Sequence, residues 1–258
     1  MRTNRQSLAA TLLSCLLSIS AAHAALTKET IGKHVCDLYV PASVTADKPA
    51  PLLMLFHGSG RDGMSQINEW RKLADKEGIV LVAPNATNRE HWVIPDDGPE
   101  LLRDIVTFVS KKAPIDQRRV YAFGHSAGAV FLLSMAPLES ELFAAVVAHA
   151  GEFSAIGTSG VLPFADRMIP IFLIIGSKDQ NFTVASVQRT RDALVAAGFP
   201  AEMREIPGHD HNYYRRSAEI NDMAWAFLAP KHLDDDARYK IYTIFKNGNT
   251  VSMVPAKP

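Results

Sequence analysis

Runs of hydrophobic residues alternate with amphipathic stretches along almost the whole chain. Leu52–Phe56 and Ile171–Ile175 are continuously apolar, which is typical of strands buried on both faces of a parallel sheet. The predicted strands are His34–Val40, Leu52–His57, Ile79–Ala83, Val120–Gly124, Ala144–His149, Ile171–Ile175 and Ala201–Ile206.

Apolar residues recur at helical spacing in segments between these strands. The predicted helices carry apolar stripes over residues 67–74, 101–109, 184–195 and 220–228. Gly78, Gly198 and Pro230 follow three of these stripes, as expected where a helix ends. The alternation of strand and helix predicts an α/β fold, a three-layer sandwich with a mostly parallel sheet and helices on both faces.

The two ends of the chain follow other patterns. Residues 239–245 and 250–254 alternate around Asn247-Gly248, which predicts a β-hairpin within a C-terminal appendage at residues 233–258. At the other end, residues 1–24 combine arginines, a short apolar run and the small residues Ala22-His23-Ala24. This order is typical of a secretory signal peptide, cut before Ala25. We therefore expect a secreted or periplasmic protein with its main domain at residues 25–232.

Composition narrows the class of protein. With 258 residues, 47% hydrophobic and 21% charged, the chain is neither disordered nor a multi-span membrane protein. Lys and Arg together number 27, as do Asp and Glu. The chain therefore lacks the basic excess that would indicate a nucleic-acid partner, and its charge gives no sign of a stable membrane partner. The sequence carries no signal for an oligomeric state. Without the signal peptide, Cys36 is the only cysteine, which excludes an intramolecular disulfide and predicts a buried strand residue.

The strongest chemical motif is Gly124-His125-Ser126-Ala127-Gly128, between a predicted strand and a predicted helix. A strand that turns sharply into a helix lifts the hydroxyl of its central serine above the edge of the sheet. Glycines two residues before and after are needed because side chains there would collide with the neighbouring backbone. We therefore predict that Ser126 is a nucleophile.

A serine nucleophile needs a base and an acid, which in this arrangement follow it along the chain. Asp179 lies just after the buried strand Ile171–Ile175, at the carboxyl end where catalytic groups collect. Its alternative role is to cap the next helix, for which Asn181 and Thr183 lie closer. Asp166 is the weaker candidate for the acid, because it precedes that strand.

The base is His209 or His211, since both follow the predicted strand Ala201–Ile206 and the hydrophobic pattern does not separate them. A metal site at these two histidines lacks a third ligand motif, so we predict no metal and no cofactor. His57-Gly58-Ser59-Gly60 follows another predicted strand. The backbone N–H groups of Ser59 and Ala127 are the predicted donors of an oxyanion hole.

Together these motifs resemble a serine α/β-hydrolase, over about residues 33–229. The closer similarity is to secreted esterases of the polyhydroxybutyrate-depolymerase and feruloyl-esterase type, carried by Tyr39-Val40-Pro41, Asp96-Asp97 and Ile115–Tyr121. The segment Asp210-His211-Asn212-Tyr213-Tyr214 is similar to the end of S-formylglutathione hydrolases, where the histidine after Asp is the base. This resemblance implies His211 as the base.

The chain also departs from the polymer esterases, since it has neither disulfides nor a visible substrate-binding domain. The interval between the strands at 144–149 and 171–175 is short, which predicts an open site without a large lid. Candidate substrate contacts are the loop aromatics Trp92, Phe153, Phe182 and Tyr213.

The predicted function is hydrolysis of a carboxylic ester through an acyl-enzyme, by Ser126, His211 and Asp179. The partner is then an ester substrate, either a small molecule or a group attached to a polymer. Two other hypotheses remain open: a serine peptidase of the prolyl-oligopeptidase kind, and a non-catalytic binding protein on the same fold.

Overall fold

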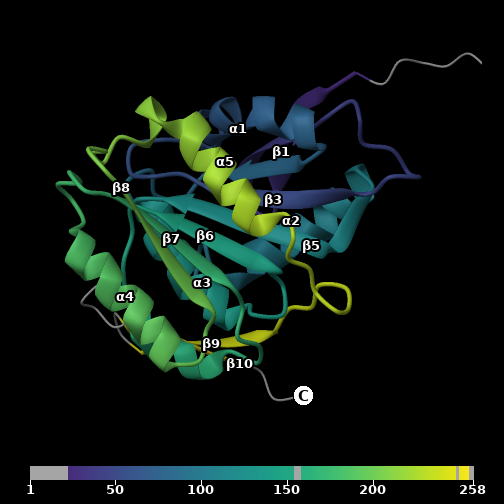
Figure 1. The fold of residues 1–258 in the computed structure, drawn as a ribbon. Coiled ribbons are helices and arrows are strands. Elements are labelled where there is room, and N and C mark those ends of the chain that lie inside the picture. Colours follow the sequence, from purple (N-terminus) through teal and green to yellow (C-terminus); the bar gives the residue numbers. More distant parts are fainter. Residues whose placement is uncertain (1–22, 154–157, 248–249, 256–258) are drawn as a thin grey trace, which may run out of the picture.

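The computed structural model describes residues 23–153, 158–247 and 250–255. Its main sheet has the strand order β1-β2-β4-β3-β5-β6-β7-β8 (Figure 1). β2 runs antiparallel to both β1 and β4, and the strands from β4 to β8 in this order are parallel. The strands are β1 (Ala25–Ile31), β2 (His34–Val40), β3 (Ala50–Phe56), β4 (Val80–Pro84), β5 (Ile115–His125), β6 (Ala145–His149), β7 (Ile171–Gly176) and β8 (Ala201–Ile206).

Helices cover both faces of this sheet, as Figure 1 shows. The helix α1 (Gly63–Glu77) and the helix α5 (Ser217–Leu228) pack on one face. The other face carries α2 (Pro99–Lys112), α3 (Ala127–Leu138) and α4 (Val184–Ala196). Alternate residues of β3 enter the two hydrophobic cores, so this strand is buried on both sides. The predicted three-layer α/β sandwich is confirmed.

The sequence prediction missed the edge strand β1 and placed the start of β5 too late. β1 is mostly exposed, so its residues form no continuous apolar run. β5 begins with the polar stretch Asp116–Arg119, which the hydrophobic pattern did not recognise as strand. The described residues between β6 and β7 include the short helix η1 (Thr158–Phe164), and another short helix, η2 (Tyr213–Arg215), precedes α5.

Cys36 lies on β2 and is fully buried. Burial raises the pKa of its thiol to about 12, so the thiol stays protonated and unreactive near neutral pH. In the described ranges, no helix has both the length and the apolar character needed to cross a membrane.

Two strands near the C-terminus, β9 (Tyr242–Asn247) and β10 (Thr250–Pro255), pair antiparallel with Asn247 opposite Thr250. Of the predicted turn Asn247-Gly248, Asn247 is the last residue of β9, and Gly248 lies outside the described part of the chain, as do residues 1–22 of the predicted signal peptide. The first residue of β9 and the segment before it are held against the end of α3. The Tyr242 hydroxyl donates to the Leu138 carbonyl oxygen at 2.7 Å, and the Lys240 N–H donates to Glu139 Oε2 at 3.2 Å.

Glu139 should give the fold a pH-dependent stability. Its side chain is 1% exposed, and burial raises its pKa from 4.5 to about 7. Because the folded state holds the proton more tightly, the stabilisation is fully present below pH 4.5 and is lost as the pH rises through 7. The raised pKa corresponds to a change in the free energy of unfolding on the order of 1–3 kcal/mol.

Glu139→Gln keeps a neutral side chain at every pH. It should leave the Tm almost unchanged at pH 5 and raise it by about 3–8 °C at pH 8, measured by thermal melts of both proteins. The exposed Glu202 of β8 provides the control, and Glu202→Gln should shift the Tm equally at the two pH values. An equal gain from Glu139→Gln at pH 5 and pH 8 would contradict the assignment.

Candidate active site

A sharp turn joins β5 to α3 at Ser126. This residue has φ 54° and ψ −120°, a strained conformation of the kind that functional turns hold. A Cβ on Gly124 would lie 2.4 Å from the carbonyl oxygen of Gly128, and one on Gly128 would lie 2.2 Å from that of Phe56. Both glycines are therefore needed for the backbone to make this turn.

Three side chains from different loops form a chain of hydrogen bonds at the carboxyl edge of the sheet. Ser126 follows β5, Asp179 follows β7 and His211 follows β8. His211 Nε2 lies 2.9 Å from Ser126 Oγ, and His211 Nδ1 lies 2.9 Å from Asp179 Oδ2. With Nδ1 donating to the carboxylate, Nε2 is free to accept the proton of the serine hydroxyl. This arrangement can activate a hydroxyl as a nucleophile.

The side chain of Asp179 is fully buried, and backbone groups fix its orientation. Its Oδ1 accepts hydrogen bonds from the N–H groups of Asn181 (2.8 Å) and Phe182 (2.9 Å). Burial alone would raise the pKa of Asp179, but these bonds and the one from His211 outweigh burial and hold the pKa below its ordinary value. Thr183 caps α4, so Asp179 is not needed as the cap.

The two sequence candidates for the base occupy different environments. His211 contacts Ser126, whereas His209 is buried with its Nε2 3.2 Å from His149 Nε2. His149 Nδ1 in turn lies 2.9 Å from His125 Nδ1. Sequence reasoning missed this chain of three imidazoles, because nothing in the hydrophobic pattern marks His149 as a polar partner. The weaker acid candidate, Asp166, forms an ion pair with Lys240.

Burial disfavours the charged form of the three buried histidines. Burial lowers the pKa of His125 to about 3 and also lowers the pKa values of His149 and His209. All three are therefore neutral near pH 7. Within the described ranges, no three His, Cys, Asp or Glu side chains gather in a way that would hold a metal ion.

The loop formed by residues 57–60 runs directly past the serine turn. A Cβ on Gly58 would lie 3.2 Å from the Cβ of Ser126. The Ser59 N–H donates no hydrogen bond to any described residue. Ala127 stands in the first turn of α3, where backbone N–H groups lack a partner within the helix. Both amides predicted to hold an oxyanion are therefore free to donate.

A cavity of about 350 Å³ opens over Ser126. Its lining mixes polar and apolar surface in similar amounts and is made by Gly58, Ser59, Arg61, His125, Ser126, Asn181, His211, Asn212 and Tyr214. The Arg61 guanidinium lies 4.6 Å from the centre of the Tyr214 ring. Arg61, Asn181, Asn212 and Tyr214 were not predicted from the sequence, although each lies within a few residues of a motif that was.

The four predicted substrate contacts do not line this cavity. Tyr213 requires a correction: it is fully buried, and its hydroxyl donates to Asn221 Oδ1 at 2.6 Å, so its neighbour Tyr214 occupies the cavity wall instead. The remaining three aromatics are partly buried against the core. Trp92 stacks on Phe131, Phe153 and Phe182 pack against the hydrophobic core, and the Phe182 ring lies 5.9 Å from that of His211.

A sequence profile of the Dienelactone hydrolase family matches residues 66–241, which is more than half of the chain. The chain belongs to the dienelactone hydrolase family. It is therefore a serine α/β-hydrolase, as the motifs predicted, and esterase-type hydrolysis is the activity that its relatives support.

Curated relatives include enzymes of different size and activity. A bifunctional acetylxylan esterase/xylanase, XynS20E from Neocallimastix patriciarum, is 30% identical over 59% of this chain and 22% of its own. Esterase YpfH from Escherichia coli is 25% identical over 74% of this chain and 89% of its own. Dipeptidyl-peptidase 5 from Porphyromonas gingivalis is 25% identical over 67% of this chain and 32% of its own. The chain thus spans less than a third of two of these relatives.

Solved structures share the fold at low sequence identity. The fluorophosphonate-binding serine hydrolase FphF from Staphylococcus aureus has a TM-score of 0.65 at 16% identity and covers 80% of this chain and 98% of its own. A ferulic acid esterase has a TM-score of 0.62 at 15% identity and covers 80% of this chain and 97% of its own. These similarities confirm the α/β-hydrolase fold with its open sheet.

Proposed function

We propose that this protein is an exported serine hydrolase that cleaves carboxylic esters through an acyl-enzyme. The observation that carries the proposal is the chain of two 2.9 Å contacts that joins Ser126 to His211 and His211 to Asp179. Its support from relatives is the family membership and the named esterases, of which YpfH is matched over most of its length.

In the proposed mechanism, His211 Nε2 takes the proton of Ser126 as Oγ attacks the acyl carbon. The negative charge that develops on the former carbonyl oxygen is held by the N–H groups of Ser59 and Ala127. His211 then gives its proton to the leaving alcohol, which departs and leaves the acyl group on Ser126. Asp179 stabilises the imidazolium and keeps its Nδ1 proton directed at the carboxylate. A water molecule, activated by His211 in the same way, then attacks the acyl group on Ser126 and releases the acid.

The cavity favours a substrate whose ester is accessible and whose flanking groups can form hydrogen bonds. Asn181, Asn212 and Tyr214 offer hydrogen-bonding groups around Ser126, and no lid covers the cavity within the described residues. An ester attached to a larger molecule can reach such an open site. This property supports hydrolysis of attached or soluble esters.

Peptide hydrolysis is the competing function, because one relative is a dipeptidyl-peptidase. The match spans 32% of that relative, so most of the relative lies outside the aligned region. The same nucleophile could cleave either bond, so the preference has to be measured. A non-catalytic binding protein is the third hypothesis and predicts no turnover of either substrate.

The test uses protein recovered from the exported fraction of the host. Its intact mass should correspond to a chain that begins at Ala25, and an unprocessed Met1 species in that fraction would contradict export by a cleaved signal peptide. The protein is then assayed with p-nitrophenyl acetate and alanine p-nitroanilide at equal concentration. We expect the ester to be hydrolysed at least about 100-fold faster, since binding of the transition state decides between substrates. A preference for the anilide would favour the peptidase.

A further inference from the structure

Residues 85–97, which follow β4, pack against the loop of residues 57–60 and hold its first residue. The Ala86 N–H donates to His57 Nε2 at 3.1 Å. The indole Nε1 of Trp92 donates to the carbonyl oxygen of His57 at 3.0 Å. Both the side chain and the backbone of His57 are therefore fixed by segment 85–97.

The same segment also holds the far end of the loop. The Gly60 N–H donates to the Arg89 carbonyl oxygen at 3.0 Å, and Arg89 Nε donates to the Gly60 carbonyl oxygen at 3.1 Å. Ser59 lies between these two attachment points, so the direction of its N–H depends on segment 85–97. The contacts use donors and acceptors on both sides of Ser59 and leave its N–H free.

His57 can make its contacts in only one protonation state. A backbone N–H can only donate, so Nε2 must present its lone pair to Ala86, and the proton of the neutral ring sits on Nδ1. That nitrogen lies 2.9 Å from the carbonyl oxygen of Gly58, to which it donates. Burial lowers the pKa of His57, which favours this neutral form. The ring therefore joins segment 85–97 to the loop that carries Ser59.

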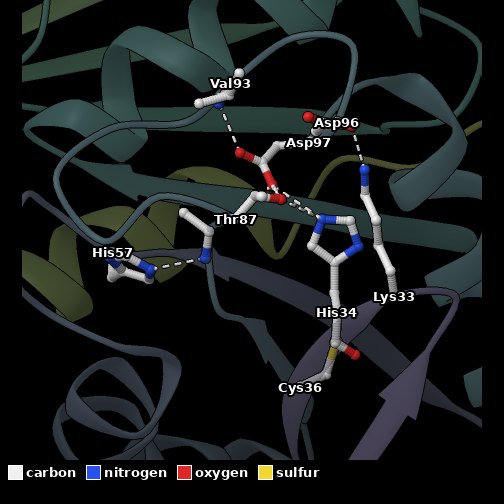
Figure 2. Close-up of polar contacts among 9 residues, drawn as sticks. Lys33, His34, Cys36, His57, Thr87, Val93, Asp96 and Asp97 are labelled. Atoms are coloured by element: carbon white, nitrogen blue, oxygen red, sulfur yellow. Dashed lines mark hydrogen bonds and ion pairs between the residues drawn. The ribbon is translucent and has the colours of Figure 1, made fainter.

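Segment 85–97 contains neither a helix nor a long strand, and the carboxylate of Asp97 holds it together (Figure 2). Asp97 Oδ1 accepts from the N–H and the hydroxyl of Thr87, at 2.9 and 2.6 Å. His34 Nε2 on β2 lies 2.9 Å from the same oxygen. Asp97 Oδ2 accepts from the Val93 N–H at 2.6 Å. One carboxylate thus joins the start, the middle and the end of the segment to the sheet.

The electrostatics of Asp97 fit this role. The residue is fully buried, and burial alone would raise its pKa. The hydrogen bonds from His34, Thr87 and Val93 outweigh burial and keep the pKa below its ordinary value, so Asp97 is ionised. A buried carboxylate with several donors is stable in place and expensive to disturb.

We infer that Asp97 is a positioning residue for ester hydrolysis, which acts through segment 85–97 to fix the Ser59 N–H against the developing oxyanion. The inference rests on the proposed function of Ser59. Because a misplacement of about 1 Å at a catalytic group can cost 10²-fold in rate, loosening the segment should lower turnover without abolishing it.

The test is Asp97→Asn, which keeps the size of the side chain. Its amide nitrogen cannot accept, so one set of donors, either Val93 or the pair Thr87 and His34, loses its partner. We expect kcat for p-nitrophenyl acetate to fall about 10- to 100-fold while KM changes less than about threefold. Affinity for a boronic-acid transition-state analogue should fall by a similar factor, because the lost contact acts in the transition state.

Asp96→Asn is the matched control. Asp96 is the neighbouring aspartate, half-exposed and paired with Lys33 on the surface, so its replacement should leave kcat unchanged. Thr87→Val removes one donor to Asp97 and should give a smaller loss of kcat, which Thr87→Ser should restore. If Asp97→Asn does not fold, kcat of Thr87→Val and Thr87→Ser tests the positioning role of Asp97 instead.

Hydrogen exchange separates this inference from the proposed function. In Asp97→Asn, the amides of residues 57–61 should exchange faster than in wild type, whether or not the wild type hydrolyses esters. If wild-type protein lacks esterase activity but this exchange still rises, the proposed function fails and the positioning of the loop stands. Unchanged kcat together with unchanged exchange in Asp97→Asn would overturn the inference, as would a KM increase that accounts for the whole loss.

Discussion

Replacing Ser126 by alanine should lower the turnover of ester substrates by about 10⁶-fold and leave the fold intact. The Ser126 side chain bonds to His211, so its removal takes away the nucleophile and one hydrogen bond. Alanine can occupy the same strained turn at a cost similar to that of serine, because both residues carry a Cβ. The measurements are kcat for p-nitrophenyl acetate and the far-UV circular dichroism of both proteins.

Ser134→Ala is the control for this substitution. Ser134 lies on α3, and its hydroxyl donates to the carbonyl oxygen of Val130 at 3.2 Å, away from the proposed reaction. It should therefore keep wild-type turnover. A fluorophosphonate probe should label wild type and Ser134→Ala but not Ser126→Ala. Persistent labelling of Ser126→Ala would show that the reactive serine lies elsewhere.

His211→Ala should cost at least about three decades of kcat, whereas His209→Ala should cost at most about one. Without His211, no side chain takes the proton from Ser126, and the imidazolium that Asp179 stabilises does not form. His209 contacts His149 in the interior, so its loss changes packing around the site and leaves the 2.9 Å contact between His211 and Ser126 in place.

The two histidine variants serve as controls for each other, because they lie two residues apart in one loop. Both should keep a cooperative thermal transition, and their kcat values are compared at a fixed pH. A larger loss in His209→Ala than in His211→Ala would contradict the assignment of the base. In that case the proton path to Ser126 would run through the buried histidines.

Much of the fold could be predicted because it depends on local patterns. β3 and β7 are continuous apolar runs, and their burial on both faces follows from that pattern alone. The glycines around Ser126 report a backbone requirement that is likewise local. Ser126, Asp179 and His211 each follow a strand of the parallel part of the sheet, so the order of the strands places all three at the same edge. The structure brings these three side chains within hydrogen-bonding distance, and their catalytic roles remain predictions.

Other features depended on turns and on contacts distant in sequence. Gly208 has φ 72° and redirects the backbone just before His209, a conformation that no hydrophobic pattern indicates. Whether Tyr213 or Tyr214 faces the cavity depends on the short helix η2, which the prediction lacked. The contact between His34 and Asp97 spans 63 positions of sequence. Contacts between residues so distant in sequence form only when the sheet is assembled, and local patterns do not indicate them.

The buried chain of His125, His149 and His209 has a direction, because each pair of facing nitrogens shares one proton. When His125 Nδ1 donates to His149, the latter must donate onward from Nε2 to His209. When the proton order is reversed, His125 receives at Nδ1 and carries its own proton on Nε2. His125 belongs to the cavity wall. The proton order of a ring two side chains away therefore decides which nitrogen of this wall residue carries its proton.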